Sequence, residues 1–514
     1  MSRITYLSKN RRGFYITVLL LTTVFYSQAQ KEANNWFFGQ RVGITWNDTR
    51  DVTVTGLFGT PDIELKGLPT IVPNASSITL ATQEGCFSLS DSNGNLLFYS
   101  DGIRVWNRNH SLMPNGNSLT GNDSSTQSGI IMPYPENPNK YIAVTLGTST
   151  NTLSYSVIDM TLNSGLGDVE TATKNTMFTG YTGNVSEAVT SIRHANGKDL
   201  WVAVPAKGTQ NMYAWLITKD GVSANPVVSS TSVSLTGNVG YMKFSPDGTH
   251  FAWAGGDHNL YMGNFDTATG QFSNIKRLTP SPAECYGSGY VYGLEFSASG
   301  KYLYVSTAEG GTLQVWKVDA LMAASDPASV PSHILNFPDC PILGASQLAP
   351  DGRIYISAYY KTHMYVVDNP EEYDDLRIYQ LPTGFLTGNN VHCRIGLPSF
   401  AANWFNISLE GDDTFCVATP QTFNVIIEKS SGSDEISHTE WDFGDGSALI
   451  KDTNVNGTQT HTHTYEKKGV YTITVRVFKK SDGSEVTGQR QCFNVKVASC
   501  LLPVNHNIST MEFY

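Results

Sequence analysis

The sequence is poor in charged residues, and no cluster of basic residues occurs after residue 30. Only 15% of its 514 residues are Asp, Glu, Lys or Arg, and the formal net charge is -11. Because phosphate binding needs clustered Lys and Arg, nucleic acid and anionic membranes are not expected partners. No segment carries a sustained helical repeat, while Gly, Tyr and Phe are frequent, as in short strands joined by turns. The composition therefore predicts an all-β protein.

Long apolar runs are absent as well. The longest, residues 14–26, follows basic residues and precedes small and polar ones. It is shorter than the ~20 residues that a transmembrane helix needs, and its flanks are typical of a secretory signal peptide. We therefore predict a signal peptide over 1–30 and no transmembrane segment after its removal. The mature protein is expected to be secreted, extracellular or on the outer cell surface.

A turn that contains glycine recurs through the long N-terminal region. Each turn precedes a strand rich in aromatic and β-branched residues, and Gly197, Gly248, Gly300 and Gly352 lie 51 to 52 residues apart. A period near 50 is typical of a β-propeller, in which each repeat is a four-stranded blade. The chain is also too long for one core, so at least two domains are expected.

Six blades can be counted between residues 78 and 390. A seventh follows if the ends of the region join, with 35–39 and 42–46 as its second and third strands and 397–405 as its inner strand. Such a closure would leave no frayed edge. We therefore predict a seven-bladed β-propeller over 31–406.

A short motif near the C-terminus is the most specific part of the chain. In it Trp441 and Phe443 alternate as inward residues of one strand, and the turn that follows needs positive φ. The motif consists of Trp441, Asp442, Phe443, Gly444, Asp445 and Gly446, followed by His463 and Tyr465. With these residues, 407–498 resembles a PKD domain, which implies an immunoglobulin-like β-sandwich of a secreted or cell-surface protein, followed here by a short tail, 499–514.

The N-terminal region resembles the WD40/YVTN-like propeller half of PKD-bearing surface proteins of Bacteroidota. The similarity is carried by NNWFFG at 34–39, GNLLFYSDGIRVWN at 94–107, FSPDG at 244–248 and QLAPDGRIYIS at 347–357. The resemblance implies export, usually with a C-terminal sorting domain. Only 501–514 follow the PKD-like module, so either a truncated gene product or another export route is expected.

The chain has seven cysteines and no C-x-x-C pair, which disfavours a zinc ribbon or a thioredoxin-like site. Cys416 and Cys492 lie in the first and last strands of the PKD-like module, so a disulfide between them is one prediction. A bond between Cys340 and Cys393 is a second. The odd total leaves at least one thiol free or linked to another chain.

Two groups of residues are candidate metal ligands. His461 and His463 lie two apart on a strand, but the resemblance gives His463 a structural place. Asp91, Asn93 and Asn95 alternate like the ligands of a calcium loop. The acidic residue that would complete such a loop is missing, so we favour a hairpin turn. No metal or other cofactor is expected, and calcium is the one alternative left open.

A hydrolase or lyase on a propeller needs carboxylates that face the central funnel and differ in pKa. Glu187, Glu284 and Glu295 lie near inner strands and are the only candidates. The competing interpretation is that they are hydrated spacers. No nucleophile elbow, phosphate loop or dinucleotide fingerprint is present.

Aromatic residues offer a second kind of site. Tryptophans recur inside alternating strands at Trp106, Trp201, Trp215, Trp253 and Trp316, which favours packing between blades over stacking on sugars. Loops are the better candidates for ligand binding, and the candidate loops contain Tyr286, Tyr292, Gly310, Tyr359 and Tyr360.

The sequence therefore favours a secreted, non-catalytic binding or adhesion protein. The propeller would bind a glycan or an envelope or surface protein, and the PKD-like module would act as a spacer or interaction module. One alternative is an extracellular polysaccharide hydrolase or lyase. Another is a structural component of the envelope or of a gliding apparatus.

Overall fold

The computed structural model describes residues 31–402 except 149–151, 257, 279–289, 309 and 338–341, and residues 414–498 except 417–419, 428–435, 454–456, 467–468, 481–482 and 484–490. The predicted signal peptide and tail lie outside these residues. The described chain is almost entirely β-structure, and its one α-helix is α1 (Val318–Ala323). The predicted all-β class is therefore confirmed. No helix among the described residues is long and apolar enough to cross a lipid bilayer.

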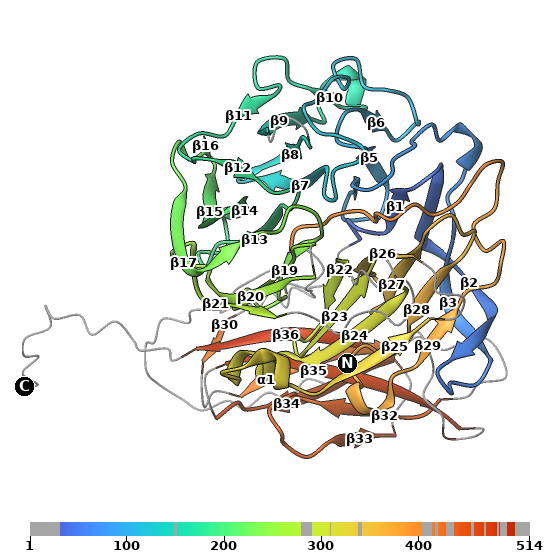
Figure 1. Cartoon of the computed structure of the whole chain (residues 1–514). Helices are drawn as coiled ribbons and strands as arrows, with labels where there is room; N and C mark the ends of the chain where they lie inside the picture. Colours follow the sequence, from blue (N-terminus) through green and yellow to red (C-terminus); the bar gives the residue numbers. More distant parts are fainter. Residues whose placement is uncertain are drawn as a thin grey trace, which may run out of the picture.

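The strands of residues 31–402 form separate antiparallel sheets arranged as the blades of a β-propeller (Figure 1). One sheet contains β4 (Phe87–Ser90), β5 (Leu96–Ser100) and β6 (Val105–Asn107). The next contains β7 (Gly129–Tyr134), β8 (Asn137–Leu146), β9 (Leu153–Asp159), β10 (Asp168–Val169) and β11 (Thr176–Met177). A third contains β12 (Asn184–Val185), β13 (Thr190–Arg193), β14 (Leu200–Lys207), β15 (Thr209–Thr218), β16 (Gly221–Val222) and β17 (Val227–Leu235).

The remaining blades follow in chain order. One sheet contains β18 (Met242–Phe244), β19 (His250–Ala254), β20 (Leu260–Asp266) and β21 (Gln271–Leu278). Another contains β22 (Val291–Phe296), β23 (Tyr302–Thr307), β24 (Thr312–Lys317) and β25 (Ser332–Asn336). The last sheet joins β26 (Leu343–Leu348), β27 (Ile354–Ala358), β28 (Met364–Val367) and β29 (Ile378–Gln380) to β1 (Asn35–Phe38), β2 (Val42–Leu57) and β3 (Ile63–Ile71).

The recurring glycines occupy the turns between the first and second strands of successive blades. Gly197, Gly248, Gly300 and Gly352 all have φ between 72° and 76°. Side chains other than glycine rarely adopt this left-handed conformation. The repeat seen in the sequence therefore marks a backbone requirement, and the predicted turns are confirmed.

The tryptophans of the repeats belong to the cores between sheets. Trp215, Trp253 and Trp316 are at most 1% exposed, and Trp106 and Trp201 are 4% exposed. Trp253 stacks on Tyr261 with ring centroids 4.8 Å apart, and Trp215 meets Phe178 edge to face. Packing, not sugar stacking, is therefore the role of these rings.

The two ends of the propeller region meet in one sheet, but not through the predicted strand. The end of β2 pairs with β29, with Thr55 opposite Gln380. The expectation that 397–405 supplies an inner strand beside β1 is wrong for its described part, 397–402. That part makes isolated parallel bridges to Cys86, Ile131 and Ile192, which belong to three different blades.

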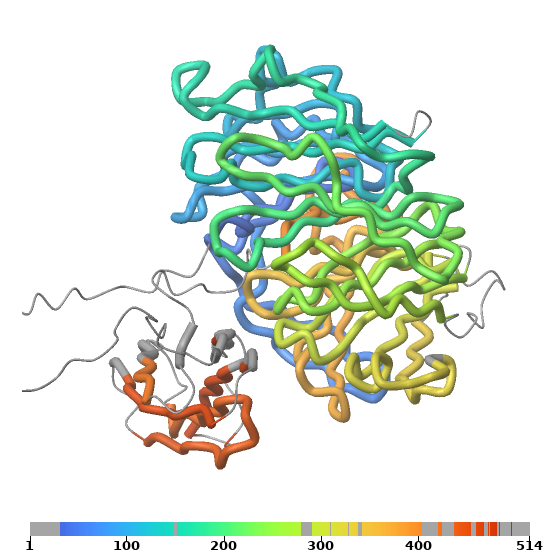
Figure 2. Tube along the Cα trace, turned by 90° about the vertical axis from the view of Figure 1, so that its left-hand side faces the viewer, coloured from blue at the N-terminus to red at the C-terminus, as the bar shows by residue number. Residues whose placement is uncertain are grey.

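The C-terminal strands form a unit of their own (Figure 2). One sheet contains β30 (Thr414–Cys416), β36 (Gln491–Ala498), β35 (Gly469–Lys479), β32 (Ile436–Asp442) and β33 (Ile450–Asp452), and β31 (Gln421–Ile427) pairs with β34 (Gly457–His463). Trp441, Phe443, Ile473 and Val475 are buried in its core. The predicted inward alternation of Trp441 and Phe443 is confirmed.

Neither predicted disulfide agrees with the structure. The parallel pairing of β30 with β36 puts Cys416 opposite Ala498, six residues from Cys492. Six residues of strand span about 20 Å, whereas the Cα atoms of a disulfide lie at most about 7 Å apart. Cys393 is a buried free thiol, and Cys340 lies outside the described residues.

Candidate functional site

Residues 394–402, here called the channel segment, run through the middle of the ring (Figure 1). At its start the amide of Ala345 donates to the carbonyl of Ile395 (2.7 Å), and the amide of Ile395 donates to the carbonyl of Gln83 (3.1 Å). Further along, the amide of Leu397 donates to the hydroxyl of Tyr241, which in turn donates to the carbonyl of Leu397. Backbone bonds to several blades therefore hold the segment in place.

The channel segment also fits tightly. A Cβ atom built on Gly396 would lie 1.6 Å from the carbonyl oxygen of Glu84, and one on Gly344 would lie 2.0 Å from the carbonyl oxygen of Ile395. At its far end, the amide of Ala402 donates to the carbonyl of Ser191 (2.8 Å). The centre of the propeller is thus filled by the protein's own chain instead of being an open funnel.

Glu295, the predicted candidate in the middle of an inner strand, belongs to a buried ion pair. Its Oε2 lies 2.6 Å from Nζ of Lys243 and accepts a hydrogen bond from the amide of Leu348 (2.7 Å). Burial lowers the pKa of Lys243, and the charge of Glu295 opposes this shift. The cavity beside the pair measures only about 40 Å³ and is lined in part by Phe400 and Ala402. Ligand pockets usually exceed about 300 Å³, so Glu295 is structural in this geometry.

Glu187 has a different setting, because the fold brings it to Glu84. The hydroxyl of Thr126 lies 3.3 Å from Oε2 of Glu84 and 3.5 Å from Oε2 of Glu187. Tyr292 donates to Glu84 (2.8 Å), and the side-chain amide of Asn238 donates to Glu187 (3.0 Å). We call Glu84 and Glu187 the carboxylate pair. Glu284 lies outside the described residues.

The surroundings of the carboxylate pair favour protonation. Burial raises the pKa of Glu84 to about 7, the hydrogen bond from Tyr292 opposes the shift, and the charge of Glu187 adds to it. Burial also raises the pKa of Glu187, against hydrogen bonds from Thr126 and Asn238. Near neutral pH Glu84 is therefore present in both its protonated and its ionised form, as the acid of an acid and base pair in an enzyme can be.

The sequence interpretation missed Glu84, although a signal existed. Glu84 stands three residues before β4, and Glu187 stands three residues before β13. Equivalent positions before two inner strands reach the same end of the channel. If equivalent positions of the repeats had been compared, and not only residues within strands, Glu84 and Glu187 would have been recognised as neighbours.

An exposed aromatic group lies beside this end of the channel. Tyr360 is 55% exposed with φ 59°, its ring stacks on His392 at 5.0 Å, and the guanidinium of Arg394 lies 4.2 Å from its centroid. Tyr359 meets Tyr360 edge to face at 4.4 Å. Arg394 also donates to the side chain of Gln83, the neighbour of Glu84. We call Tyr359, Tyr360, His392 and Arg394 the aromatic platform.

The other predicted loop residues do not offer such a surface. Tyr292 and Gly310 are buried, and Tyr286 lies outside the described residues. Tyr292 instead contributes its hydroxyl to Glu84. Of the predicted loop residues that the structure describes, Tyr360 is the one with an exposed ring.

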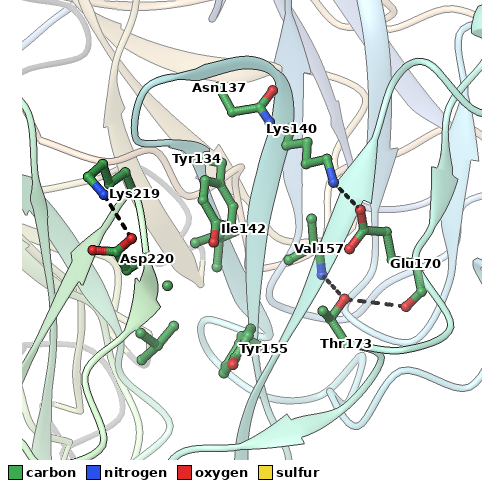
Figure 3. Close-up of a pocket in the computed structure, with 12 residues that line it drawn as sticks. Tyr134, Asn137, Lys140, Ile142, Tyr155, Val157, Glu170, Thr173, Lys219 and Asp220 are labelled. Atoms are coloured by element: carbon green, nitrogen blue, oxygen red, sulfur yellow. Dashed lines mark hydrogen bonds and ion pairs between the residues drawn. The ribbon is translucent and has the colours of Figure 1, made fainter.

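A separate cleft of about 380 Å³ lies between the sheet of β7–β11 and the sheet of β12–β17 (Figure 3). Nζ of Lys140 lies 2.5 Å from Oε1 of Glu170, and Nζ of Lys219 lies 2.9 Å from Oδ1 of Asp220. The remaining lining residues are Tyr134, Asn137, Ile142, Tyr155, Val157, Thr173, Gly221 and Val222. The sequence interpretation gave no sign of this cleft, because its lining comes from strands and turns of two different blades.

The histidines of the PKD-like motif have structural contacts. The ring of His463 stacks on Phe443 at 4.1 Å and its Nε2 lies 2.8 Å from Oδ2 of Asp445. His461 lies 3.0 Å from Oδ2 of Asp452, and Tyr465 donates to the carbonyl of Phe443. The turn that follows is held by two carboxylates. Asp442 accepts a hydrogen bond from the amide of Gly444, and Asp445 accepts one from the amide of Ser447. Gly444 and Gly446 supply the positive φ angles of the turn.

The loop with Asp91, Asn93 and Asn95 is a hairpin turn in the structure. Oδ1 of Asp91 accepts the amides of Asn93 and Asn95, both at 2.9 Å, and Gly94 has φ 87°. Across the described residues, no group of three or more metal-binding side chains comes together.

Comparisons with known proteins agree with this architecture. The sequence matches the PKD domain family over 406–497 and the WD domain, G-beta repeat, over 281–317. The fold and these matches define the protein as a β-propeller followed by a PKD module. No curated protein matches the chain.

Several solved structures are similar to this chain at low sequence identity. A Lactobacillus plantarum protein has 15% identity, covers 68% of this chain and 97% of its own, and gives a TM-score of 0.39. The hydrazine synthase of Kuenenia stuttgartiensis has 12% identity, and the match covers 67% of this chain and 96% of that chain with a TM-score of 0.37. A β-propeller domain from Myceliophteria thermophila has 13% identity, and the match covers 47% of this chain and 86% of that chain with a TM-score of 0.25. Similarities this low carry no conclusion about function.

Proposed function

We propose that this protein is a secreted or surface-exposed binding protein whose seven-bladed propeller recognises a glycan or a surface protein. Its PKD module, an immunoglobulin-like sandwich over 407–498, acts as a spacer or interaction module. The matches to the PKD and WD families support an extracellular type of binding architecture. The signal-like N-terminus seen in the sequence supports export.

The filled channel is the observation that carries this proposal. Because residues 394–402 occupy the middle of the ring, a ligand binds outside the channel. The aromatic platform offers a surface beside the channel end. Aromatic faces and a guanidinium suit the C–H faces and hydroxyls of sugars, and backbone strain such as that at Tyr360 tends to cluster at ligand-binding sites.

A hydrolase or lyase is the second candidate, and the carboxylate pair favours it. Glu84 and Glu187 flank one hydroxyl and have raised pKa values, so one can donate a proton while the other accepts one. In this candidate the catalytic residues are Glu84 and Glu187, whereas Glu295 holds Lys243.

One screen distinguishes the two candidates. The mature chain is tested for binding to immobilised polysaccharides while released sugar is measured in the same wells. Tyr360→Ala is compared with Phe58→Ala, because Phe58 is also an exposed aromatic residue (42%) with positive φ (55°). Binding that is lost only in Tyr360→Ala, without released sugar, supports the binding protein. Released sugar that disappears in Glu84→Gln supports the enzyme, and no binding at all points to a protein partner.

A further inference from the structure

The cleft between the sheets of β7–β11 and β12–β17 is far from the aromatic platform. The strand β7 begins on the side of Thr126 and ends at Tyr134, which lines the cleft. Its six residues span about 20 Å. The cleft is thus at the opposite end of this inner strand from the carboxylate pair, and the proposed function does not use it.

The size of the cleft suits a small ligand. Its volume of about 380 Å³ lies within the range of about 300–1,000 Å³ found for ligand pockets. Tyr134, Tyr155 and Val222 are only partly buried, and each packs one side against the core of the two blades. The rest of each side chain lines the cleft, as the labelled Tyr134 and Tyr155 do in Figure 3.

The charges in the cleft compensate one another. Lys140 is held by Glu170 at 2.5 Å and by Asp159 at 3.4 Å, and Lys219 is held by Asp220 at 2.9 Å. An ammonium group has three donors and a carboxylate can accept several hydrogen bonds, so each pair keeps donors and acceptors for a ligand. The lining itself carries two ammonium groups, Lys140 and Lys219, and two carboxylates, Glu170 and Asp220, so a strongly charged ligand finds no net counter-charge there.

We propose that this interblade cleft binds an uncharged saccharide segment. The half-buried rings of Tyr134 and Tyr155 contact the C–H face of the sugar, and the Lys–acid pairs bind its hydroxyls from the rim. The proposal stands on the geometry of the cleft and does not depend on the aromatic platform. If both proposals are right, the propeller binds glycan on two opposite sides, which raises avidity for a polymer.

Calorimetric titration of the mature chain with neutral trisaccharides of glucose, mannose, xylose and galactose tests the cleft. A galacturonic acid trisaccharide is the charged comparison. We expect at least one neutral trisaccharide to bind, Tyr134→Ala to weaken that binding at least tenfold, and Tyr134→Phe to keep most of it. Met177→Ala is the matched control, because Met177 is exposed (43%) on β11 of the same sheet.

The outcomes separate this proposal from the proposed function. Trisaccharide binding that is weakened by Tyr134→Ala but not by Tyr360→Ala supports the cleft. Binding of no neutral trisaccharide, binding of the uronic acid trisaccharide alone, or equal binding by Tyr134→Ala and wild type overturns it. The melting temperatures of Tyr134→Ala, Tyr134→Phe and Met177→Ala show whether the fold is intact for these comparisons.

Discussion

Gly396 lies so close to Glu84 that a methyl group on its Cα would sit 1.6 Å from the Glu84 carbonyl oxygen. This contact ties the channel segment to the carboxylate pair. It also explains why a glycine follows Ile395, since any side chain there would push the segment away from the blade that carries Glu84. The filled channel and the site at its end are therefore one structural arrangement.

Gly396→Ala should destabilise the propeller. The added methyl meets backbone that cannot turn aside, and overpacking of this kind costs about 1–3 kcal/mol. Urea unfolding measures the change in the free energy of unfolding. Gly352→Ala is the control: a Cβ there meets nothing within 4 Å, so only its positive φ of 76° is strained. Equal stability of Gly396→Ala and wild type would contradict the close approach.

The stability of the propeller should fall as pH rises from about 4.5 to about 7. The folded-state pKa of Glu84 is about 7 against 4.5 for the ordinary group, so the folded state keeps a proton that the unfolded chain releases. The stabilising contribution is thus complete below pH 4.5 and is lost as pH passes through 7. Glu84→Gln should flatten this dependence in thermal unfolding between pH 4.5 and 8, about the span of its titration. A variant as pH-dependent as wild type would refute the assignment.

Lys243→Met should be strongly destabilising. It leaves the carboxylate of Glu295 buried without its partner, which typically costs about 3–5 kcal/mol. The double variant Lys243→Met with Glu295→Leu removes both charges and should recover much of this loss. Denaturant unfolding of the three proteins checks the order of stability. If Lys243→Met loses less than about 1 kcal/mol, the pair is not desolvated as the structure indicates.

The thiols of Cys86 and Cys393 should resist alkylation in the folded protein. Both side chains are fully buried, and burial raises the pKa of Cys393 to about 12 and that of Cys86 well above its ordinary value. Thiolate, the reactive form, is therefore scarce. Iodoacetamide labelling followed by peptide mass spectrometry should modify these two positions only after denaturation. Rapid labelling of either one without denaturant would argue against the packing around it.

Local patterns made parts of this fold predictable. The turn glycines were visible because positive φ imposes glycine locally, and the Trp441 and Phe443 alternation was visible because a strand has period two. The path of residues 397–402 was not visible. Its isolated bridges to Cys86, Ile131 and Ile192 join residues far apart in the sequence and leave no periodic pattern.

The site was harder to predict for the same reason. Glu295 was chosen for its place in a strand, but its charge is balanced by Lys243 on the neighbouring blade, 52 positions away. Glu84 and Glu187 stand over a hundred positions apart and meet only because each precedes an inner strand. Repeat proteins bring equivalent positions together, so repeat register is the information that a strand-by-strand interpretation lacks.

The filled channel is tested most directly by trapping the channel segment in place. Pro398 bridges Cys86 in parallel register, which brings their backbones within the ~4.4–6.8 Å that a disulfide spans. When Pro398→Cys is refolded from denaturant under oxidising conditions, so that Cys86 can react before it is buried, peptide mapping should reveal a bond between the new thiol and Cys86, while Leu112→Cys, at an exposed site, should form none with Cys86. A folded Pro398→Cys protein in which Cys86 stays free would contradict a channel filled by residues 394–402.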